Sequence, residues 1–299
     1  MGGVMARTYK LTFPRILRSE WVKVFSLRST WWILLIAVVA NVGMCAAIAG
    51  TALYNEHQIV ANPDAAGLPP GLRPDDLQPG DLGMLTFSMT QACGIFGQLI
   101  FVILSILIIT NEYSSGMIRS TFTIVPRRGR VLIAKILVVV VLCLIVFSIS
   151  LAAGWPLGHM ILQNSAGMDL SLTSPTSLRI FGGFMINMVL VSVFCFGLGA
   201  TIRSTPGSIG AAVGIILVLP IAIGALTGTI SANPAEPTGW KKWLSDISAF
   251  LPTNAGNQVV QVHPAANAIL GPWQGIGVLG IWALASVIVA LMVTWRRDV

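Results

Sequence analysis

Charged residues are scarce in this sequence. They make up 10% of the 299 residues, whereas a soluble domain normally devotes about a quarter of its residues to charge. Hydrophobic residues account for 55%, and the mean hydropathy is +0.82. This composition excludes an ordinary soluble domain and predicts an integral membrane protein.

Sequence motifs of soluble enzymes are missing as well. The chain has no GxxxxGK[ST] phosphate loop, no HExxH and no GxSxG. The three histidines, His57, His159 and His263, are expected in outer loops and lack metal-ligand spacing. The cysteines form no CxxC pair and are expected to be packed inside four different apolar runs: Cys45, Cys93, Cys143 and Cys195. We therefore expect no catalytic, cofactor or metal site, and no ATP hydrolysis by this chain alone.

Six apolar runs are long enough to cross a bilayer, because about 20 helical residues span its ~30 Å hydrocarbon core. The runs are approximately 32–52, 87–110, 132–153, 180–202, 209–230 and 275–295. Only residues 203–208 separate the fourth and fifth runs, and Pro206 and Gly207 favour a turn there. About thirty residues precede the first run, and the run itself is longer than the ~7–15-residue core of a signal peptide. We therefore expect an uncleaved helix. The sequence thus predicts an all-α fold in one transmembrane domain, residues 1–299.

Positive charges are concentrated on one side of the predicted membrane. Of the 18 Lys and Arg residues, all but four lie in 1–31, in 111–135, in 203–208 or in 296–299. The four on the other side are Arg73, Arg179, Lys241 and Lys242. By the positive-inside rule, both termini and the central basic segment are cytoplasmic. Topology accounts for the net charge of +7, and we do not expect nucleic-acid binding.

The central basic segment, residues 111–130 (NEYSSGMIRSTFTIVPRRGR), contains four arginines and a single acid, Glu112. Residues 111–124 are predicted to form a short helix with Asn111 as its cap and Glu112 in its first turn. Pro126 ends that helix. A compact element between two spans suits a segment that receives movement from a partner. A basic loop that anchors to anionic lipid headgroups explains the same residues, and both interpretations stay open.

Residues 13–30 precede the first span, and the spacing of their apolar and basic residues predicts a basic amphipathic helix. The residues on its apolar face are Phe13, Ile16, Leu17, Trp21, Val24 and Phe25, and those opposite are Arg15, Arg18, Ser19 and Lys23. Such a helix is expected to lie in the inner membrane interface. Glu20 falls at the apolar margin, where it can pair with Lys23. Trp31 and Trp32 follow and are expected at headgroup level.

The predicted spans contain almost no charge. Their polar residues include Asn41, Gln98 and Asn187, which we expect to form hydrogen bonds between helices rather than to bind a substrate. Lys135 is the exception and is expected to extend to the inner surface. Ion-coupled transporters usually bind protons or sodium at charged residues within their spans. The composition therefore disfavours a secondary transporter.

Residues 232–273 form a long outer segment before the last span. Within it, Trp240, Trp243, Leu244 and Ile247 recur at helical spacing. They predict an amphipathic helix on or dipping into the outer leaflet.

The fifth run contains two GxxxG pairs, and such pairs permit close approach of helix backbones. The pairs are Gly210 with Gly214 and Gly224 with Gly228. Packing within the chain and packing against a second subunit both remain open. Pro220 is expected to kink this helix.

Three stretches, in this order, resemble the membrane subunits of type-2 ABC exporters, particularly actinobacterial ones. They are LRSEWVKVFSLRSTWWILL at 17–35, EYSSGMIRSTFTIVPRRGRVLIAK at 112–135 and ISAFLPTNAG at 247–256. The resemblance covers essentially the whole chain. It implies a connecting helix that includes Glu20, Trp21 and Lys23. It also implies a coupling helix whose ATPase-contacting candidates are Glu112, Tyr113, Met117, Arg119, Arg127, Arg128 and Arg130.

The resemblance also implies partners and a location. Two permease copies, identical or similar, would pair with two separate ATPase subunits that bind the ATP and magnesium, and Glu112 would face the ATPase. The outer helix would help to close the external exit, and the first and fifth spans would meet at the subunit interface. The expected location is the bacterial cell membrane. A non-transporting membrane sensor or assembly scaffold is the alternative class, followed by an ion-coupled secondary transporter.

Overall fold

The structure is a computed structural model that describes residues 12–61, 94–117, 128–162, 175–228, 239–261 and 269–296. Within these ranges the chain is helical and has no β-strand, which confirms the predicted all-α fold. The helices are α1 (Phe13–Ser26), α2 (Arg28–Ala61), α4 (Gly94–Ser114), α6 (Arg128–Leu162), α7 (Pro175–Ile202), α8 (Thr205–Val213), α9 (Leu219–Thr227), α10 (Trp240–Ser248), α11 (Pro252–Asn257) and α12 (Pro272–Arg296). Two short segments join them, the π-helical turn η2 (Gly214–Val218) and the 3₁₀ turn η3 (Gln258–Val260).

Six helical stretches are long and apolar enough to cross a membrane, as predicted. They are Arg28–Thr51, Gly97–Ser114, Gly129–Leu157, Leu178–Ile202, Thr205–Thr227 and Pro272–Arg296. The chain is therefore a multi-pass membrane protein by length and composition of its helices. Residues 87–93 of the predicted second span lie outside the described ranges.

Two helices are longer than the apolar runs predicted. α2 continues to Ala61 and α6 to Leu162, so the backbone at His57 and His159 is helical. The prediction that these two histidines lie in loops is wrong, because the helices extend past the apolar windows that ended the predicted spans. His263 lies outside the described residues.

The turn predicted between the fourth and fifth spans is present. α7 ends at Ile202, and Arg203 adopts a left-handed conformation with φ 60°. Ser204 then caps α8, its hydroxyl accepting a hydrogen bond from the backbone N–H of Gly207 at 3.5 Å. A left-handed residue followed by an N-cap reverses the chain direction, so the two spans are separate helices.

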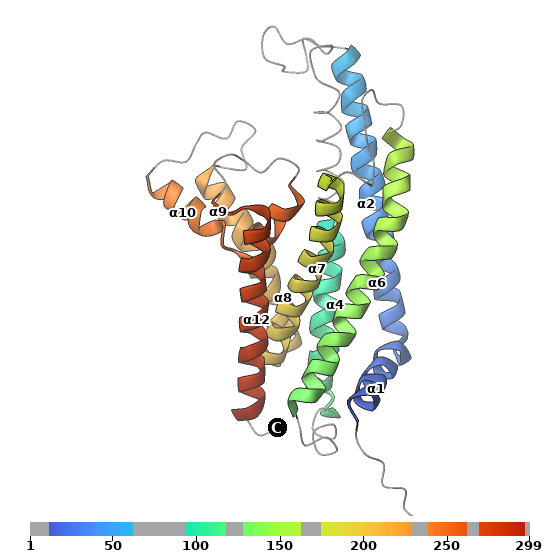
Figure 1. Cartoon of the computed structure of the whole chain (residues 1–299), viewed down its shortest axis with the longest axis vertical. Helices are drawn as coiled ribbons and strands as arrows, with labels where there is room; N and C mark the ends of the chain where they lie inside the picture. The colour runs from blue at the N-terminus through green and yellow to red at the C-terminus, as the bar shows by residue number, and fades with distance from the viewer. Residues whose placement is uncertain are drawn as a thin grey trace, which may run out of the picture.

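The helices stand roughly side by side, with α4 and α7 in the middle of the bundle (Figure 1). α7 packs against α12, α4 and α6, while α2 packs against α6 and α4. The main core is built from large apolar side chains of the central helices, among them Phe101, Phe147, Phe184 and Phe196. α1 and the C-terminal end of α12 lie at one end of the bundle, and α10 lies at the other (Figure 1).

The fifth span is a continuous run of α8, η2 and α9. Pro220 in α9 has no N–H, so the Ile216 carbonyl loses the donor that an unbroken α-helix would supply. The hydroxyl of Thr253 in α11 donates to that carbonyl at 2.8 Å. The irregularity expected at Pro220 thus takes the form of a π-helical turn, and a side chain of the outer segment satisfies the exposed backbone group.

The outer segment includes the predicted amphipathic helix, which is α10. After it, α11 and η3 pack against α7 and α12. Glycine permits this close contact: a methyl group at Gly256 would overlap the Asn187 side chain, and one at Gly275 would overlap the Ala255 carbonyl. Arg179 at the start of α7 donates to the Gln261 carbonyl at 2.8 Å. Residues 239–261 of this segment therefore form a cap on one end of the bundle.

Candidate functional site

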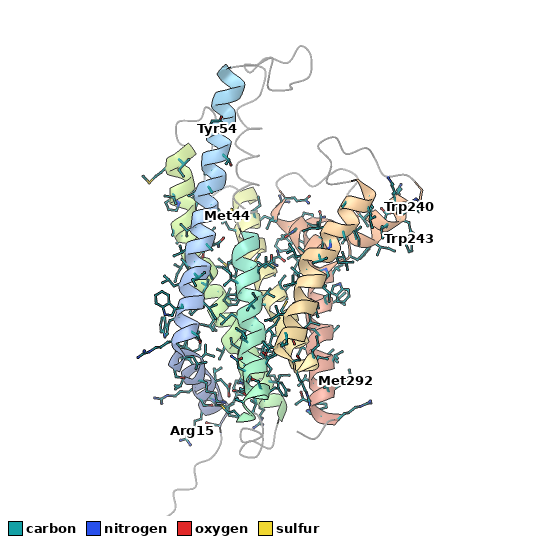
Figure 2. All side chains as sticks on the ribbon, turned by 180° about the vertical axis from the view of Figure 1, so that it is seen from behind. Arg15, Met44, Tyr54, Trp240, Trp243 and Met292 are labelled. Carbon is teal, nitrogen blue, oxygen red and sulfur yellow. The ribbon has the colours of Figure 1, made fainter. Side chains whose placement is uncertain are left out.

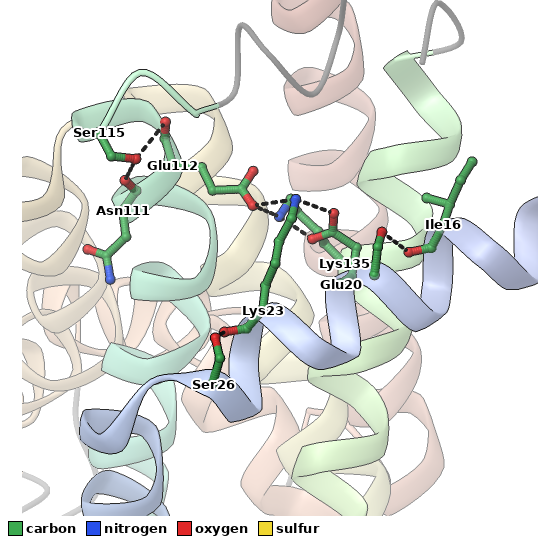
Figure 3. Close-up of polar contacts among 9 residues, drawn as sticks. Ile16, Glu20, Lys23, Ser26, Asn111, Glu112, Ser115 and Lys135 are labelled. Carbon is green, nitrogen blue, oxygen red and sulfur yellow. Dashed lines mark hydrogen bonds and ion pairs between the residues drawn. The ribbon is translucent and has the colours of Figure 1, made fainter. Parts of the chain in front are cut away.

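Four charged side chains form a cluster at the end of the bundle where α1 lies (Figure 3). We call Glu20, Lys23, Glu112 and Lys135 the charge cluster. Lys135 Nζ lies 2.5 Å from Glu20 Oε2 and 2.6 Å from Glu112 Oε1. Lys23 Nζ lies 2.7 Å from Glu20 Oε1 and 3.1 Å from Glu112 Oε1. Each ammonium group therefore bridges both carboxylates, and the four side chains join three helices.

The helical period of α1 places Glu20 in the cluster. Ile16, Glu20 and Val24 recur every four residues and form the buried stripe of this helix. α1 packs along α6, whose second turn supplies Lys135. The sequence put Glu20 at the margin of the apolar face; the structure puts it in the middle of the buried stripe. The predicted pairing of Glu20 with Lys23 is confirmed.

The charge cluster is largely withdrawn from solvent. Glu20 and Lys135 are each 2% exposed and Glu112 is 7% exposed, while the Lys23 side chain is 32% exposed. Burial opposes the charge of Lys23, but its hydrogen bonds to Glu20 and the nearby Glu112 outweigh burial and raise its pKa. Two positive and two negative charges balance, which is the condition under which buried ionic groups are tolerated.

Two predictions about this region are wrong. α4 continues to Ser114, so Asn111 does not begin a new helix and Glu112 lies in the last turn of α4. A carboxylate there is disfavoured by the helix dipole, and the two lysines compensate. Lys135 does not extend to the inner surface, because the carboxylates of Glu20 and Glu112 take the place of water around its ammonium group.

The last turn of α4 is held from a second side by Arg203. The guanidinium carbon of Arg203 lies 5.1 Å from the centre of the Tyr113 ring, within the range of a cation–π interaction. The same guanidinium donates to the Val293 carbonyl of α12 at 3.1 Å. Glu112 and Tyr113, adjacent in sequence, thus connect α4 to opposite parts of the bundle.

The other predicted ATPase-contacting residues are described in part. Met117 is 48% exposed, and Arg130 at the start of α6 is exposed. Arg128 is the first residue of α6. Arg119 and Arg127 lie outside the described residues. The structure therefore brings Glu112 to the α1–α6 contact and Tyr113 to Arg203, and it leaves Met117 and Arg130 on the surface.

In α1, Trp21 packs against the core, and its ring centre lies 4.9 Å from that of Phe25 with the two rings tilted by 42°. Phe25 in turn lies 5.1 Å from Trp31. Trp31 and Trp32 are 57% and 64% exposed. These exposed rings at the start of α2 fit the predicted headgroup-level position.

A cavity of about 340 Å³ adjoins the charge cluster. Its walls are contributed by α1, the start of α2 and the end of α4, and its lining includes all four cluster residues. Glu112 Oε2, which takes no part in the ion pairs, is buried and has no hydrogen-bond partner among the described residues. The cluster thus presents one unsatisfied acceptor beside an open space.

The sequence predicted the pair of Glu20 with Lys23 but not its meeting with Glu112 and Lys135 in one site. The available signal was the rarity of their charges: Lys135 lies inside an apolar run, where a charge needs a partner, and Glu112 is the single acid of the central basic segment. Glu20 is similarly unusual, because it lies on the apolar face of a helix. Since two carboxylates and two ammonium groups balance in charge, their rarity suggests that these four residues meet.

The predicted amphipathic helix α10 leaves most of its large apolar side chains exposed. In α10, Trp240, Trp243 and Ile247 are exposed and Leu244 is half-buried. The tryptophans lie at the end opposite Arg15 and Met292 (Figure 2). Their exposure fits an interfacial helix.

The glycines of the fifth span differ in their surroundings. A methyl group added at Gly210 or Gly214 would meet no atom within 4 Å. Gly224 is buried. Gly228 is a left-handed C-cap with φ 81°, so it ends α9 instead of packing against another helix. Only the first GxxxG pair therefore presents an open face.

The described residues contain no group of three or more His, Cys, Asp or Glu that could hold a metal ion. Cys45, Cys143 and Cys195 are buried, as expected, and form no disulfide within the described ranges; Cys93 lies outside those ranges. Of the amides, Asn187 donates to Asn257 at 3.5 Å between helices, whereas Gln98 Nε2 is buried and has no hydrogen-bond partner in the part of the chain that the structure describes.

Fold and site together define a multi-pass helical membrane protein with a buried charge cluster at one end. Comparison of the sequence with known protein families and with curated proteins finds no match.

Proposed function

We propose that this chain is the membrane subunit of an ATP-driven exporter that resembles the type-2 ABC class and works with a separate ATPase subunit. In this proposal two permease copies form the translocation pathway in the bacterial cell membrane, with both termini in the cytoplasm. The ATPase binds at the connection between α4 and α6. The ATP and magnesium belong to that partner.

The observation that carries the proposal is the position of Glu112 at the end of α4. Its carboxylate pairs with Lys23 of α1 and Lys135 of α6, immediately before the connection that would receive the ATPase. Buried ion pairs resist separation, because a carboxylate that loses its lysines stays buried without a partner. A displacement of the α4–α6 connection would therefore move three helices together.

Tyr113 extends this mechanical connection. Through Arg203 it links the last turn of α4 to α7 and to the Val293 carbonyl of α12. Movement at the end of α4 would thus reach both sides of the bundle. The proposed roles of Glu112 and Tyr113 are to transmit movement inside the permease, while exposed residues such as Met117 and Arg130 supply contact surface.

An ion-coupled secondary transporter is the second candidate. The sequence disfavoured it because the predicted spans contain almost no charge, but one structural observation speaks for it. Glu112 and Lys135 lie within the candidate spans Gly97–Ser114 and Gly129–Leu157 and are buried. Both, however, sit near the end of their spans and are engaged in a balanced cluster, whereas proton or sodium relays need charged groups along the pathway. ATP dependence separates the two candidates.

The proposal is tested by co-expressing the chain with ABC-type ATPase subunits from the same genome and purifying the chain in detergent. We expect the ATPase to co-purify and to hydrolyse ATP, and the isolated chain to hydrolyse none, because it has no phosphate loop. Glu112→Ala should insert into the membrane, yet the ATPase activity should no longer respond to the permease. ATP hydrolysis by the isolated, homogeneous chain, or failure of any ATPase to associate, would contradict the proposal.

A further inference from the structure

The cavity beside the charge cluster has two chemically different parts. One part is polar and consists of the cluster itself, with Lys23 half-buried at the edge and Glu112 Oε2 buried without a partner among the described residues. The other part is a wall of aliphatic side chains, Val24, Leu27, Ile33, Leu104, Leu107 and Ile108. A site with a polar end and an apolar wall fits an amphiphile better than a water-soluble ligand.

The depth of the cavity in the bundle agrees with this composition. It lies at the first turns of the span Arg28–Thr51 and the last turns of the span Gly97–Ser114. In a membrane these span ends meet the boundary between headgroups and acyl chains. Exposed Trp31 and Trp32 mark the same level. A membrane lipid would therefore present its headgroup at the charge cluster and an acyl chain at the aliphatic wall.

The carboxylate oxygen Oε2 of Glu112 indicates which lipid headgroup fits this cavity. A carboxylate oxygen only accepts hydrogen bonds, and leaving it buried without a donor is unfavourable. Both lysines engage the other oxygen of the same carboxylate, and no group in the described ranges donates to Oε2, so a bound ligand can supply this donor. A primary ammonium group supplies N–H donors and the matching charge, whereas a quaternary ammonium group supplies the charge without a donor.

The negatively charged phosphate of such a headgroup would also find binding partners in the cavity. Lys23 Nζ is the most accessible cation of the cluster, and its third N–H, beyond those directed at Glu20 and Glu112, can donate to a phosphate. Ser29 lines the same cavity and can donate as well. The hydroxyls of Ser26 and Ser115 also lie there but donate to the Lys23 and Asn111 carbonyls. A zwitterionic headgroup leaves the balanced charge of the cluster unchanged, which a purely anionic or cationic ligand would not.

We propose that this cavity binds a membrane phospholipid with a primary-ammonium headgroup, whose ammonium donates to Glu112 Oε2 and whose phosphate contacts Lys23. The volume of about 340 Å³ falls in the range of ligand pockets and accommodates the headgroup with part of one chain. The bound lipid completes the hydrogen bonding of the charge cluster. The site belongs to a single copy of the chain and is independent of any ATPase.

Phosphatidylethanolamine and phosphatidylcholine with identical acyl chains provide the test, because they differ only in the N–H donors of the headgroup. The full chain is titrated with each lipid in detergent, and bound lipid is counted by native mass spectrometry. A charge-assisted hydrogen bond corresponds to a preference of about tenfold or more for the ethanolamine lipid. Equal retention of both lipids, or retention of neither, would refute the site.

Variants locate the binding. Ser29→Trp fills the cavity from α2 without altering the cluster and should remove the preference; Ser148→Trp, at an exposed position of α6 away from the cavity, should keep it. Glu112→Gln, which replaces the free oxygen by an amide, should lower the preference toward unity even if Ser29→Trp folds poorly. An unchanged preference in both Ser29→Trp and Glu112→Gln would show that the lipid binds elsewhere and would overturn the proposal.

Discussion

At the scale of single residues, the charge cluster is the most unusual feature of this chain. Lys135 has two carboxylate partners within 2.6 Å and is 2% exposed. Its ammonium group neutralises the negative charge that Glu112 brings to the end of α4. The stability of the α1–α4–α6 contact therefore depends on this side chain more than on the half-exposed Lys23.

Replacing Lys135 by methionine should strongly destabilise the chain. The variant leaves two buried carboxylates with one lysine, and breaking such a pair costs about 3–5 kcal/mol. Thermal unfolding in detergent, followed by circular dichroism, should show a clear decrease in the midpoint. The control Lys242→Ala, at an exposed position of α10, should leave the midpoint unchanged.

The double variant Lys135→Met with Glu20→Gln separates charge imbalance from loss of packing. It leaves Lys23 and Glu112 as a neutral pair, whose atoms lie 3.1 Å apart in the structure. We expect the double variant to recover part of the stability lost in Lys135→Met, because the two sites interact directly. Strictly additive losses would show that the charges are not coupled.

At the scale of elements, the sequence predicted helices well and their contacts poorly. The apolar runs predicted all six spans, because span length is set by the thickness of the bilayer. The end of α4 was misplaced, since Asn111 and Glu112 are good N-terminal residues in isolation and only the distant Lys23 and Lys135 explain why α4 continues through them. Such long-range partners leave no periodic pattern in the sequence.

The contact between α11 and the fifth span gives a prediction at this scale. Thr253→Val removes the hydroxyl that donates to the Ile216 carbonyl while keeping the shape of the side chain. Loss of this donor should destabilise the chain by about 1–2 kcal/mol, measured by thermal unfolding. In a Pro220→Ala background the cost should shrink, because the residue at 220 then has an N–H to offer this carbonyl. The same cost in both backgrounds would contradict this role of Thr253.

Close packing of α12 against α11 gives a second prediction. Gly275→Ala places a methyl group against the backbone carbonyl of Ala255, and overpacking of this kind costs about 1–3 kcal/mol. Gly277→Ala in the same helix meets nothing within 4 Å and should be neutral or slightly stabilising, because alanine favours helix. Equal unfolding midpoints for the two variants would show that α11 does not pack against α12 in this way.

At the scale of the whole molecule, the two ends of the bundle differ in composition. α1, the start of α6 and the end of α12 carry basic residues at one end, and α10 presents exposed tryptophans at the other (Figures 1 and 2). The sequence predicted this arrangement from the distribution of Lys and Arg, because membrane insertion responds to local positive charge. The cytoplasmic assignment of the basic end remains a prediction.

Cysteine labelling tests that assignment. In a background without native cysteines, Arg130→Cys should react with a membrane-impermeant maleimide only after cells are opened, and Lys241→Cys should react in intact cells. Both positions are exposed, so unequal accessibility within the protein does not confound the comparison. Labelling of position 130 in intact cells would reverse the orientation and place the α4–α6 connection out of reach of a cytoplasmic ATPase.

The central claim, that an ATPase binds the connection after α4, is tested most directly by photo-crosslinking in cells. A benzophenone amino acid replaces Met117, which is 48% exposed beside the charge cluster, or Trp243, which is 67% exposed in α10 at the opposite end. We predict that irradiation joins position 117, and not position 243, to a polypeptide that binds ATP. Absence of an ATP-binding partner at position 117, or an equal yield at both positions, would contradict the account.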